Sequence, residues 1–262
     1  MKLSACVFLI TGGCSGLGAA AARMAWEAGA RVLLVDRCAP SPEHPLRQLD
    51  PYEERWYWQD TDVSDDTQGS AAVYMAQDRF GRLDVLLNAA GVAFEECLHG
   101  REGPHQLSTF QRVMQVNLLG SFNMMRLAVS VMMASPPRAG EPADACRGVI
   151  INTASIAAFE GQMGQVAYAA SKGGIAAMTL PAARDLAKDR IRVMAVAPGV
   201  FSTPLTAGLA LERRETLVAS VPCPPRLGQP EEYAALVRHI VENDYLNGEV
   251  IRLDGGLRLG LV

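Results

Sequence analysis

The stretch ACVFLITGGCSGLG, residues 5–18, decides the fold. Its apolar first part predicts a β-strand over 5–11, of the kind that is covered on both faces of a sheet. Its second part carries four glycines, which let the backbone turn sharply. The Ala-rich residues that follow predict a helix over 16–28. A strand, a glycine-rich turn and a helix in this order are typical of the beginning of an α/β fold.

The rest of the chain repeats this alternation. Further strands are expected at 31–35, just before Asp62, and at 85–88, 149–152, 192–197 and 249–253, with helices at 67–80, 109–132, 165–188 and 231–243. This pattern predicts a single Rossmann-fold domain over residues 1–262, a doubly wound parallel sheet of about seven strands with helices on both faces. Residues 1–150 would form the dinucleotide-binding half, and residues 151–262 the catalytic and substrate-lid half.

Three Pro-rich stretches, 40–51, 136–142 and 222–230, fall between these elements. For the first two we expect surface loops, because clustered prolines mark connections. The segment 203–225 contains Leu, Thr and Pro and does not match one regular element. We expect it to form a lid over an apolar substrate, although Leu205 and Leu209 are also consistent with helix-core positions.

Composition excludes several classes of protein. The net charge is −4, without a cluster of Lys or Arg, so a basic nucleic-acid surface is not expected. The apolar stretch 5–10 is too short to cross a membrane. None of the six cysteines forms a CxxC pair, and the four histidines do not complete a zinc pattern, so we expect no metal and a reducing compartment. No basic, Ser-rich presequence precedes the first strand, which favours the cytoplasm.

The glycine-rich turn predicts a dinucleotide site. Glycines allow the backbone to approach a pyrophosphate closely, and the following helix presents unpaired N–H groups to the phosphates. The expected contacts of this turn are Gly12, Ser15, Gly16, Leu17 and Gly18.

Asp36, eighteen residues after Gly18, ends the second predicted strand. A carboxylate there accepts hydrogen bonds from the adenosine ribose hydroxyls and repels the 2′-phosphate of NADP, so NAD is predicted. The adjacent Arg37 leaves NADP as the alternative, since a guanidinium binds a 2′-phosphate.

Other cofactor contacts are expected at the carboxyl ends of strands, where ligands bind in open α/β sheets. Backbone groups of Val200 and the Thr203 hydroxyl would meet the nicotinamide carboxamide. Lys172 would hold the nicotinamide ribose, with Tyr168 beside it. The strand-end set is Asp62, Val63, Asn88, Ala89, Ala90, Gly91, Pro198, Gly199, Val200 and Thr203.

Tyr168 and Lys172 carry the clearest catalytic signal. At positions i and i+4 they share one helix face. The lysine cation would lower the pKa of the tyrosine, which then exchanges a proton with an alcohol or a carbonyl. Ser155, at a strand end, would hydrogen-bond the substrate oxygen. Asn117 lies within a predicted helix, where Asn is unfavoured unless its side chain has a role.

TGGCSGLG (11–18), NAAG (88–91), Asn117, Ser155 and YAASK (168–172) resemble the short-chain dehydrogenase/reductase family over the whole chain. The stretches 148–175, 178–187, 191–205 and 246–256 are more narrowly similar to its 3-hydroxyacyl-CoA dehydrogenases. This resemblance implies the catalytic tetrad Asn117, Ser155, Tyr168 and Lys172, and it places Gln162 and Gln165 beside the substrate.

The resemblance also implies NAD, oxidation of the 3-hydroxyl of short or branched acyl-CoA thioesters, and a homotetramer. Residues 94–108 and 207–215 depart from the pattern, which puts the acyl length in doubt. Three alternatives stay open: a 3-oxoacyl carrier-protein reductase, another alcohol or steroid dehydrogenase, and a non-catalytic scaffold.

Overall fold

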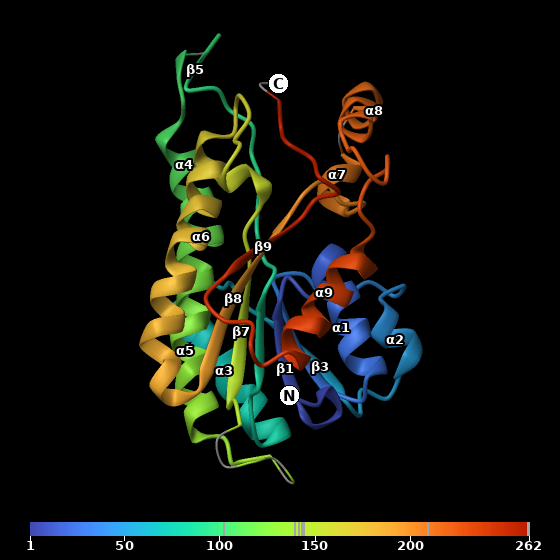
Figure 1. Ribbon diagram of the computed structural model, residues 1–262, viewed down its shortest axis with the longest axis vertical. Coiled ribbons are helices and arrows are strands. Elements are labelled where there is room, and N and C mark those ends of the chain that lie inside the picture. Colours follow the sequence, from blue (N-terminus) through green and yellow to red (C-terminus); the bar gives the residue numbers. More distant parts are fainter. Residues whose placement is uncertain (102, 139, 141, 143–144, 209, 261–262) are drawn as a thin grey trace.

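A parallel sheet forms the centre of the molecule (Figure 1). The structure, a computed structural model, describes residues 1–101, 103–138, 140, 142, 145–208 and 210–260. Within this part of the chain the sheet has seven strands in the order β3-β2-β1-β4-β7-β8-β9, each parallel to its neighbours. The strands are β1 (Val7–Thr11), β2 (Arg31–Asp36), β3 (Trp56–Asp60), β4 (Val85–Asn88), β7 (Gly148–Thr153), β8 (Ile191–Pro198) and β9 (Val250–Leu253).

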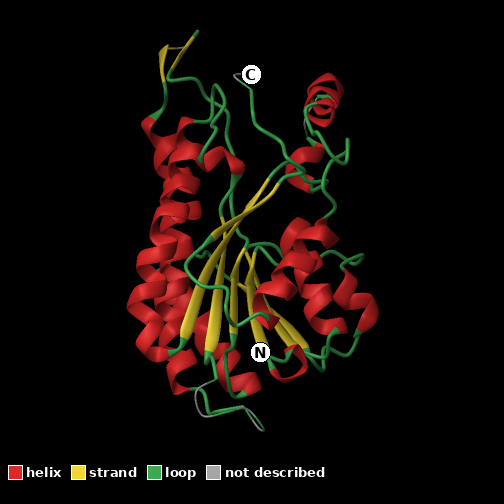
Figure 2. Ribbon diagram, viewed as in Figure 1, coloured by secondary structure: helices red, strands yellow, loops and turns green. Residues whose placement is uncertain are grey.

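Helices cover both faces of this sheet (Figure 2). On one face lie α1 (Gly16–Glu27), α2 (Pro45–Leu49) and α9 (Pro230–Glu242), and on the other lie α3 (Asp66–Phe80), α4 (Leu107–Val113), α5 (Gly120–Ala134) and α6 (Val166–Leu186). The short helices α7 (Pro204–Ala207) and α8 (Leu211–Ala219) and the hairpin β5 (His99–Gly100) and β6 (Gly103–Pro104) lie at one end of the molecule. The predicted single Rossmann-fold domain is confirmed.

Alternation along the strands builds a core on each face. In β1, Phe8 and Ile10 pack toward the side of α1 and α9, whereas Val7 and Leu9 pack toward α3 and α5. The four side chains are almost completely buried. Since successive side chains of a strand point to opposite faces, an uninterrupted apolar run is what a sheet covered on both faces requires.

The expectation of a surface loop over 40–51 is wrong. This stretch contains α2, and His44, Leu46 and Asp50 in it are buried. Pro45 occupies the first turn of α2, where its missing N–H is not needed. Leu46 packs into the same core as Trp56, so tertiary contacts bury a segment whose composition indicates a connection.

The helix expected at 109–132 is longer and less regular than predicted. It begins at Leu107, ends at Ala134, and contains a π-helical segment, η2 (Met114–Leu119), which includes Asn117. By length and composition this run could cross a membrane, but half of its most apolar window is buried inside the fold. The buried half packs against α3, α6 and β4 as a layer of the domain.

Candidate functional site

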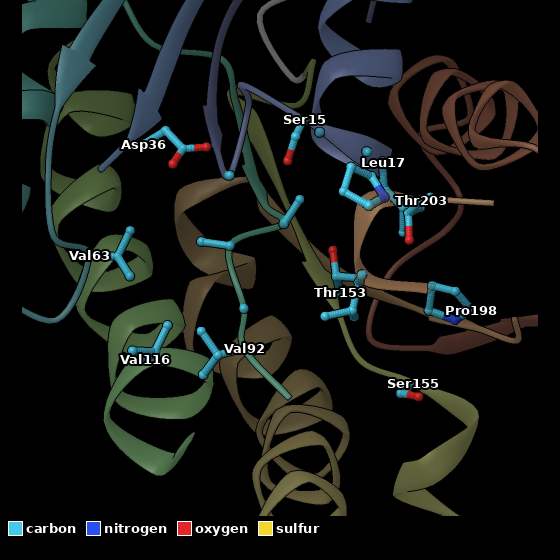
Figure 3. Close-up of a pocket in the computed structure, with 18 of the residues that line it drawn as sticks. Ser15, Leu17, Asp36, Val63, Val92, Val116, Thr153, Ser155, Pro198 and Thr203 are labelled. Atoms are coloured by element: carbon cyan, nitrogen blue, oxygen red, sulfur yellow. The ribbon is translucent and has the colours of Figure 1, made fainter. Parts of the chain in front are cut away.

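A cavity of about 340 Å³ opens where the strands end at their carboxyl sides. The segments after β1, β2, β3, β4, β7 and β8 all contribute to its wall, together with residues of α4, η2, α6 and α7. In Figure 3, Asp36 lies toward one end of the cavity and Ser155 toward the other. Ser15, Leu17 and Thr203 lie on one side, opposite Val63, Val92 and Val116.

The glycine-rich turn after β1 packs too tightly for side chains at several positions, of which Gly12 and Gly18 are two. A Cβ added to Gly12, which has a φ of +64°, would come within 2.8 Å of the backbone of Ala90. A Cβ on Gly18 would come within 2.2 Å of the Gly12 carbonyl oxygen. These contacts explain why glycine is required, and they leave the backbone itself as the cavity wall, as dinucleotide binding needs.

Asp36 is fixed by two backbone donors. The N–H of Cys14, in the glycine-rich turn, donates to Oδ2 at 3.2 Å, and the N–H of Cys38 donates to Oδ1 at 3.3 Å. An ionised carboxylate accepts about four hydrogen bonds, so each oxygen keeps capacity for a ligand hydroxyl. Arg37 also lines the cavity. A guanidinium therefore accompanies the Asp36 carboxylate at this end of the site.

Asp62 and Val63, after β3, line the same end of the cavity. The Ser64 hydroxyl donates to Asp62 at 2.7 Å, and this bond is the main cause of a lowered pKa for the Asp62 carboxyl. Burial opposes the shift, while Arg37 and Arg112 add to it. Asp62 therefore remains ionised at neutral pH.

The segment after β4 forms the floor between the two ends. The Thr11 hydroxyl accepts hydrogen bonds from the N–H groups of Ala89 and Ala90, both at 3.1 Å, and both residues line the cavity with Gly91. Asn88 does not line it. Its side chain is buried and donates to the Ser121 carbonyl and to Asn152.

Tyr168 and Lys172 project from α6 into the other end of the cavity, beside Ser155. The Lys172 Nζ lies 5.7 Å from the centre of the Tyr168 ring and donates to the Thr153 carbonyl at 2.6 Å. Ser155 hydrogen-bonds the Tyr168 side chain. Three of the four predicted catalytic residues thus meet in one wall of the cavity.

Burial dominates the titration of this pair. It raises the pKa of Tyr168 above its ordinary value, and the Ser155 hydrogen bond opposes that rise. Burial also lowers the pKa of Lys172 to about 8. The expectation that the pKa of Tyr168 falls below its ordinary value is wrong in this structure, because desolvation of the phenol is the largest influence and raises that pKa. The phenol is therefore neutral at pH 7.

Asn117 acts from behind the cavity wall. Its completely buried amide donates to the Val92 carbonyl at 2.9 Å and to the Ser171 hydroxyl at 3.1 Å, and it accepts from the Val92 N–H at 2.8 Å. These bonds join the segment after β4 to helix α6, at Ser171, which lies three residues after Tyr168. In this structure Asn117 holds two walls of the site together and does not line the cavity.

The segment after β8 supplies a further wall. Pro198, Gly199 and Thr203 line the cavity, and Thr203 caps α7. Val200 does not line it, because its carbonyl accepts from the Gly228 N–H and its side chain packs against a separate apolar cluster. The expected lid segment forms two short helices, α7 and α8, instead of an irregular loop.

The predicted substrate residues divide into three groups. Leu205, more than half exposed, lines the cavity with Ser155 and Tyr168. Gln162 and Gln165 lie in the connection before α6 and do not line the cavity. Leu209 lies outside the described residues.

Sequence reasoning missed several cavity residues. Some directly follow strands that were predicted, so extending the strand-end argument by one or two positions would have found them. Others, such as Arg112 and Val116, come from a helix whose sequence carries no sign of a ligand. The residues without a predicted role are Val35, Thr61, Val92, Arg112, Val116, Thr153, Ala154, Phe201, Pro204 and Thr206.

Known proteins resemble this chain over nearly its whole length. A profile of the short chain dehydrogenase family matches residues 6–214. The chain is 48% identical to 3-hydroxyacyl-CoA dehydrogenase type-2 of Bos taurus, over 97% of this chain and 95% of that protein. It is 45% identical to the protein of the same name in Drosophila melanogaster, over 97% of each chain.

A solved structure is also similar. The crystal structure of 3-hydroxyacyl-CoA dehydrogenase type-2 from Mycobacterium avium superposes with a TM-score of 0.89 at 34% identity, covering 100% of this chain and 98% of that one. The fold and the similar proteins therefore indicate an oxidoreductase that acts on CH–OH groups and uses a nicotinamide cofactor.

Proposed function

This chain belongs to the short-chain dehydrogenase family, and we propose that it oxidises the 3-hydroxyl of short or branched 3-hydroxyacyl-CoA thioesters with NAD. One observation carries the proposal: Ser155, Tyr168 and Lys172 meet at one end of a cavity whose other end is a glycine cradle with a fixed carboxylate. The acyl-CoA substrate rests on the names of the similar proteins.

A nicotinamide dinucleotide fits the residues of the cavity. The glycine-rich turn leaves backbone where Cβ atoms would clash, which suits a pyrophosphate. Asp36 has acceptor capacity for ribose hydroxyls, and its negative charge disfavours a 2′-phosphate, which supports NAD over NADP. The cofactor would accept the hydride, and side chains of the protein would transfer the proton.

The protein's part of the reaction is assigned to three side chains. Tyr168 takes the proton of the substrate hydroxyl during oxidation and returns it to the carbonyl oxygen during reduction. Ser155 hydrogen-bonds the same oxygen and holds it at the phenol. Lys172, fixed by the Thr153 carbonyl, places its charge beside the ring and favours the phenolate needed for oxidation.

The neutral phenol suits the reducing direction directly. Since burial raises the pKa of Tyr168, the phenolate needed for oxidation becomes more abundant as the pH rises. Asn117 supports both directions by fixing Val92 and Ser171 around the site.

The proposal extends to assembly and location. Apolar side chains on the outer face of α5 and α6, namely Phe122, Met133 and Leu180, are nearly half exposed, which supports a homotetramer. Cysteines without a CxxC pair suit a reducing compartment and support a cytoplasmic enzyme. The composition gives no support to nucleic acid or membrane as a partner.

A substrate and cofactor panel tests the proposal. The kcat/KM would be measured with NAD and NADP for a straight and a branched 3-hydroxyacyl-CoA, a hydroxysteroid and a simple secondary alcohol. Reduction of a 3-oxoacyl carrier protein with NADPH completes the panel. We expect the highest value for a 3-hydroxyacyl-CoA with NAD. A preference for NADPH and the carrier protein, or for a steroid, would overturn the assignment.

A further inference from the structure

His44 is a buried titratable residue without a role in the proposed reaction. It lies at the N-terminus of α2, only 3% exposed, between two backbone groups. The N–H of Leu46 donates to its Nδ1 at 3.3 Å, and its Nε2 lies 3.1 Å from the Gly13 carbonyl oxygen. Since Nδ1 accepts, the ring proton is on Nε2 and is donated to Gly13.

The Gly13 carbonyl that His44 binds belongs to a peptide unit whose carbonyl and N–H are both hydrogen-bonded. The Gly13 carbonyl and the Cys14 N–H are part of one planar peptide. His44 donates to the carbonyl, and the N–H donates to Asp36 Oδ2 at 3.2 Å. In a trans peptide these two groups point in opposite directions, so the two bonds hold the unit from opposite sides. Rotation of this peptide would break both bonds.

The close packing around the glycine-rich turn favours the same orientation of the Gly13–Cys14 peptide. A Cβ on Gly13 would come within 2.8 Å of the Leu34 side chain and 2.9 Å of the Ile10 carbonyl, so the turn is pressed onto β1 and β2. Gly12 and Ser15, on either side, line the cavity. The orientation of the Gly13–Cys14 peptide therefore bears on the shape of the nucleotide cradle.

The imidazole is held independently of the cavity. Its ring stacks on Trp56 with the centroids 6.2 Å apart, and Trp56 is buried at the start of β3. The Trp56 Nε1 donates to the Asp50 carbonyl at 2.8 Å, which closes the segment 44–56 on itself. The hydrogen-bond donor is thus in place before any ligand arrives.

We propose that His44 is a positioning residue for the dinucleotide: by holding the Gly13 carbonyl, it keeps the Cys14 N–H on Asp36 and the Asp36 carboxylate turned toward the adenosine ribose. This inference rests on the proposed function, since it takes the cavity to bind a nicotinamide dinucleotide. Burial lowers the pKa of His44, which agrees with a neutral ring at pH 7.

Three variants test the inference. His44→Phe keeps an aromatic ring for Trp56 but has no donor, whereas the amide of His44→Gln retains one. Leu46→Val disturbs the packing of α2 and keeps the imidazole. The dissociation constants of NADH and NADPH would be measured by fluorescence titration, and thermal unfolding would be recorded without nucleotide.

We expect His44→Phe to weaken NADH binding about three- to tenfold, as for loss of one buried hydrogen bond. NADPH binding should weaken less, because Asp36 repels its 2′-phosphate and does not favour its binding, so the preference for NADH shrinks. His44→Gln should restore the preference for NADH. Leu46→Val should lower thermal stability without altering the preference for NADH.

A wild-type NADH preference in His44→Phe would overturn the inference. So would a loss of preference in Leu46→Val that matches its loss of stability, since packing alone would then account for the effect. If the wild-type protein bound neither nucleotide, the proposed function itself would be wrong, which is a separate result.

Discussion

The two ends of the cavity are built differently. At the dinucleotide end, backbone and buried side chains fix each other: the glycine-rich turn is pressed onto Ala90, and Asp36 accepts two backbone hydrogen bonds. At the substrate end, Leu205 lines the cavity beside Tyr168 and Ser155 with its side chain 59% exposed. The rigid end is suited to one cofactor, and the open end is where substrate range can vary.

This contrast makes the two ends separable by mutation. Changes in the catalytic wall should remove turnover without affecting dinucleotide affinity, and changes at the opening should affect only the substrate. Any variant that alters both ends together would break the contrast.

The largest effect is expected for Tyr168→Phe. Without the phenolic hydroxyl no side chain at this position exchanges the substrate proton, so kcat should fall about 10²–10⁴-fold. The ring still packs in the wall, and the NADH dissociation constant should stay within about twofold. Steady-state kinetics and fluorescence titration measure the two quantities.

Tyr74→Phe is the matched control, since Tyr74 is an exposed tyrosine on α3 and should leave both quantities unchanged. Turnover in Tyr168→Phe close to that of the wild type would contradict the assigned proton transfer.

The next effect concerns the stability of the folded protein. Lys172 is buried, and its pKa is lowered to about 8 from an ordinary 10.5. Lys172→Met removes the buried charge and loses one hydrogen bond to Thr153. The variant should therefore lose activity yet be more stable at pH 7, by about 2 kcal/mol in the free energy of unfolding.

The sign of the pH dependence follows from the same shift. Between pH 8 and 10.5 the unfolded chain binds more protons at this lysine than the folded chain, so wild-type stability gains with rising pH. Below pH 8 the ammonium is present in both the folded and the unfolded state, so burial of its charge destabilises the folded wild-type protein to the full extent. Denaturant unfolding at pH 7 and pH 10 should show the advantage of Lys172→Met shrinking; an advantage that grows with pH would refute the argument.

The smallest effect is expected for an ion pair between α8 and the segment after β4. Arg213 on α8 forms an ion pair with Glu95, and the N–H of the next residue, Glu96, donates to the Gly164 carbonyl ahead of α6. The pair thus joins α8 to the segment after β4. Because the groups are partly exposed, Arg213→Gln should change the substrate KM by less than about fivefold and leave NADH affinity unchanged.

Arg214→Gln, at the adjacent exposed position, is the control for the general charge of α8 and should change neither quantity. Altered NADH affinity in Arg213→Gln would contradict the separation of the two ends.

The rigid end was largely predictable from the sequence. Its glycines and Asp36 are local signals, and strand ends of a parallel sheet meet at one edge. At the other end, the Tyr168–Lys172 spacing is a local signal of the same kind. Most of the residues that these rules predict as cofactor contacts line the cavity.

What the sequence could not indicate depends on tertiary packing. His44 sits in a Pro-rich stretch, and it is buried against Trp56 and Gly13, which lie in other segments of the chain. The direction of the Tyr168 pKa shift depends on how deeply the phenol is buried, which spacing alone does not specify. Val200 was expected in the cavity, but its carbonyl is used by Gly228, a partner 28 residues away.

Hydride transfer itself provides the most direct test of the account. The protein would be incubated with NAD and a 3-hydroxyacyl-CoA carrying deuterium on the carbinol carbon, and the products would be analysed by mass spectrometry. We predict one deuterium in the NADH formed and a 3-ketoacyl-CoA without it. Deuterium released to water, or an acyl-CoA that is not oxidised, would contradict the account.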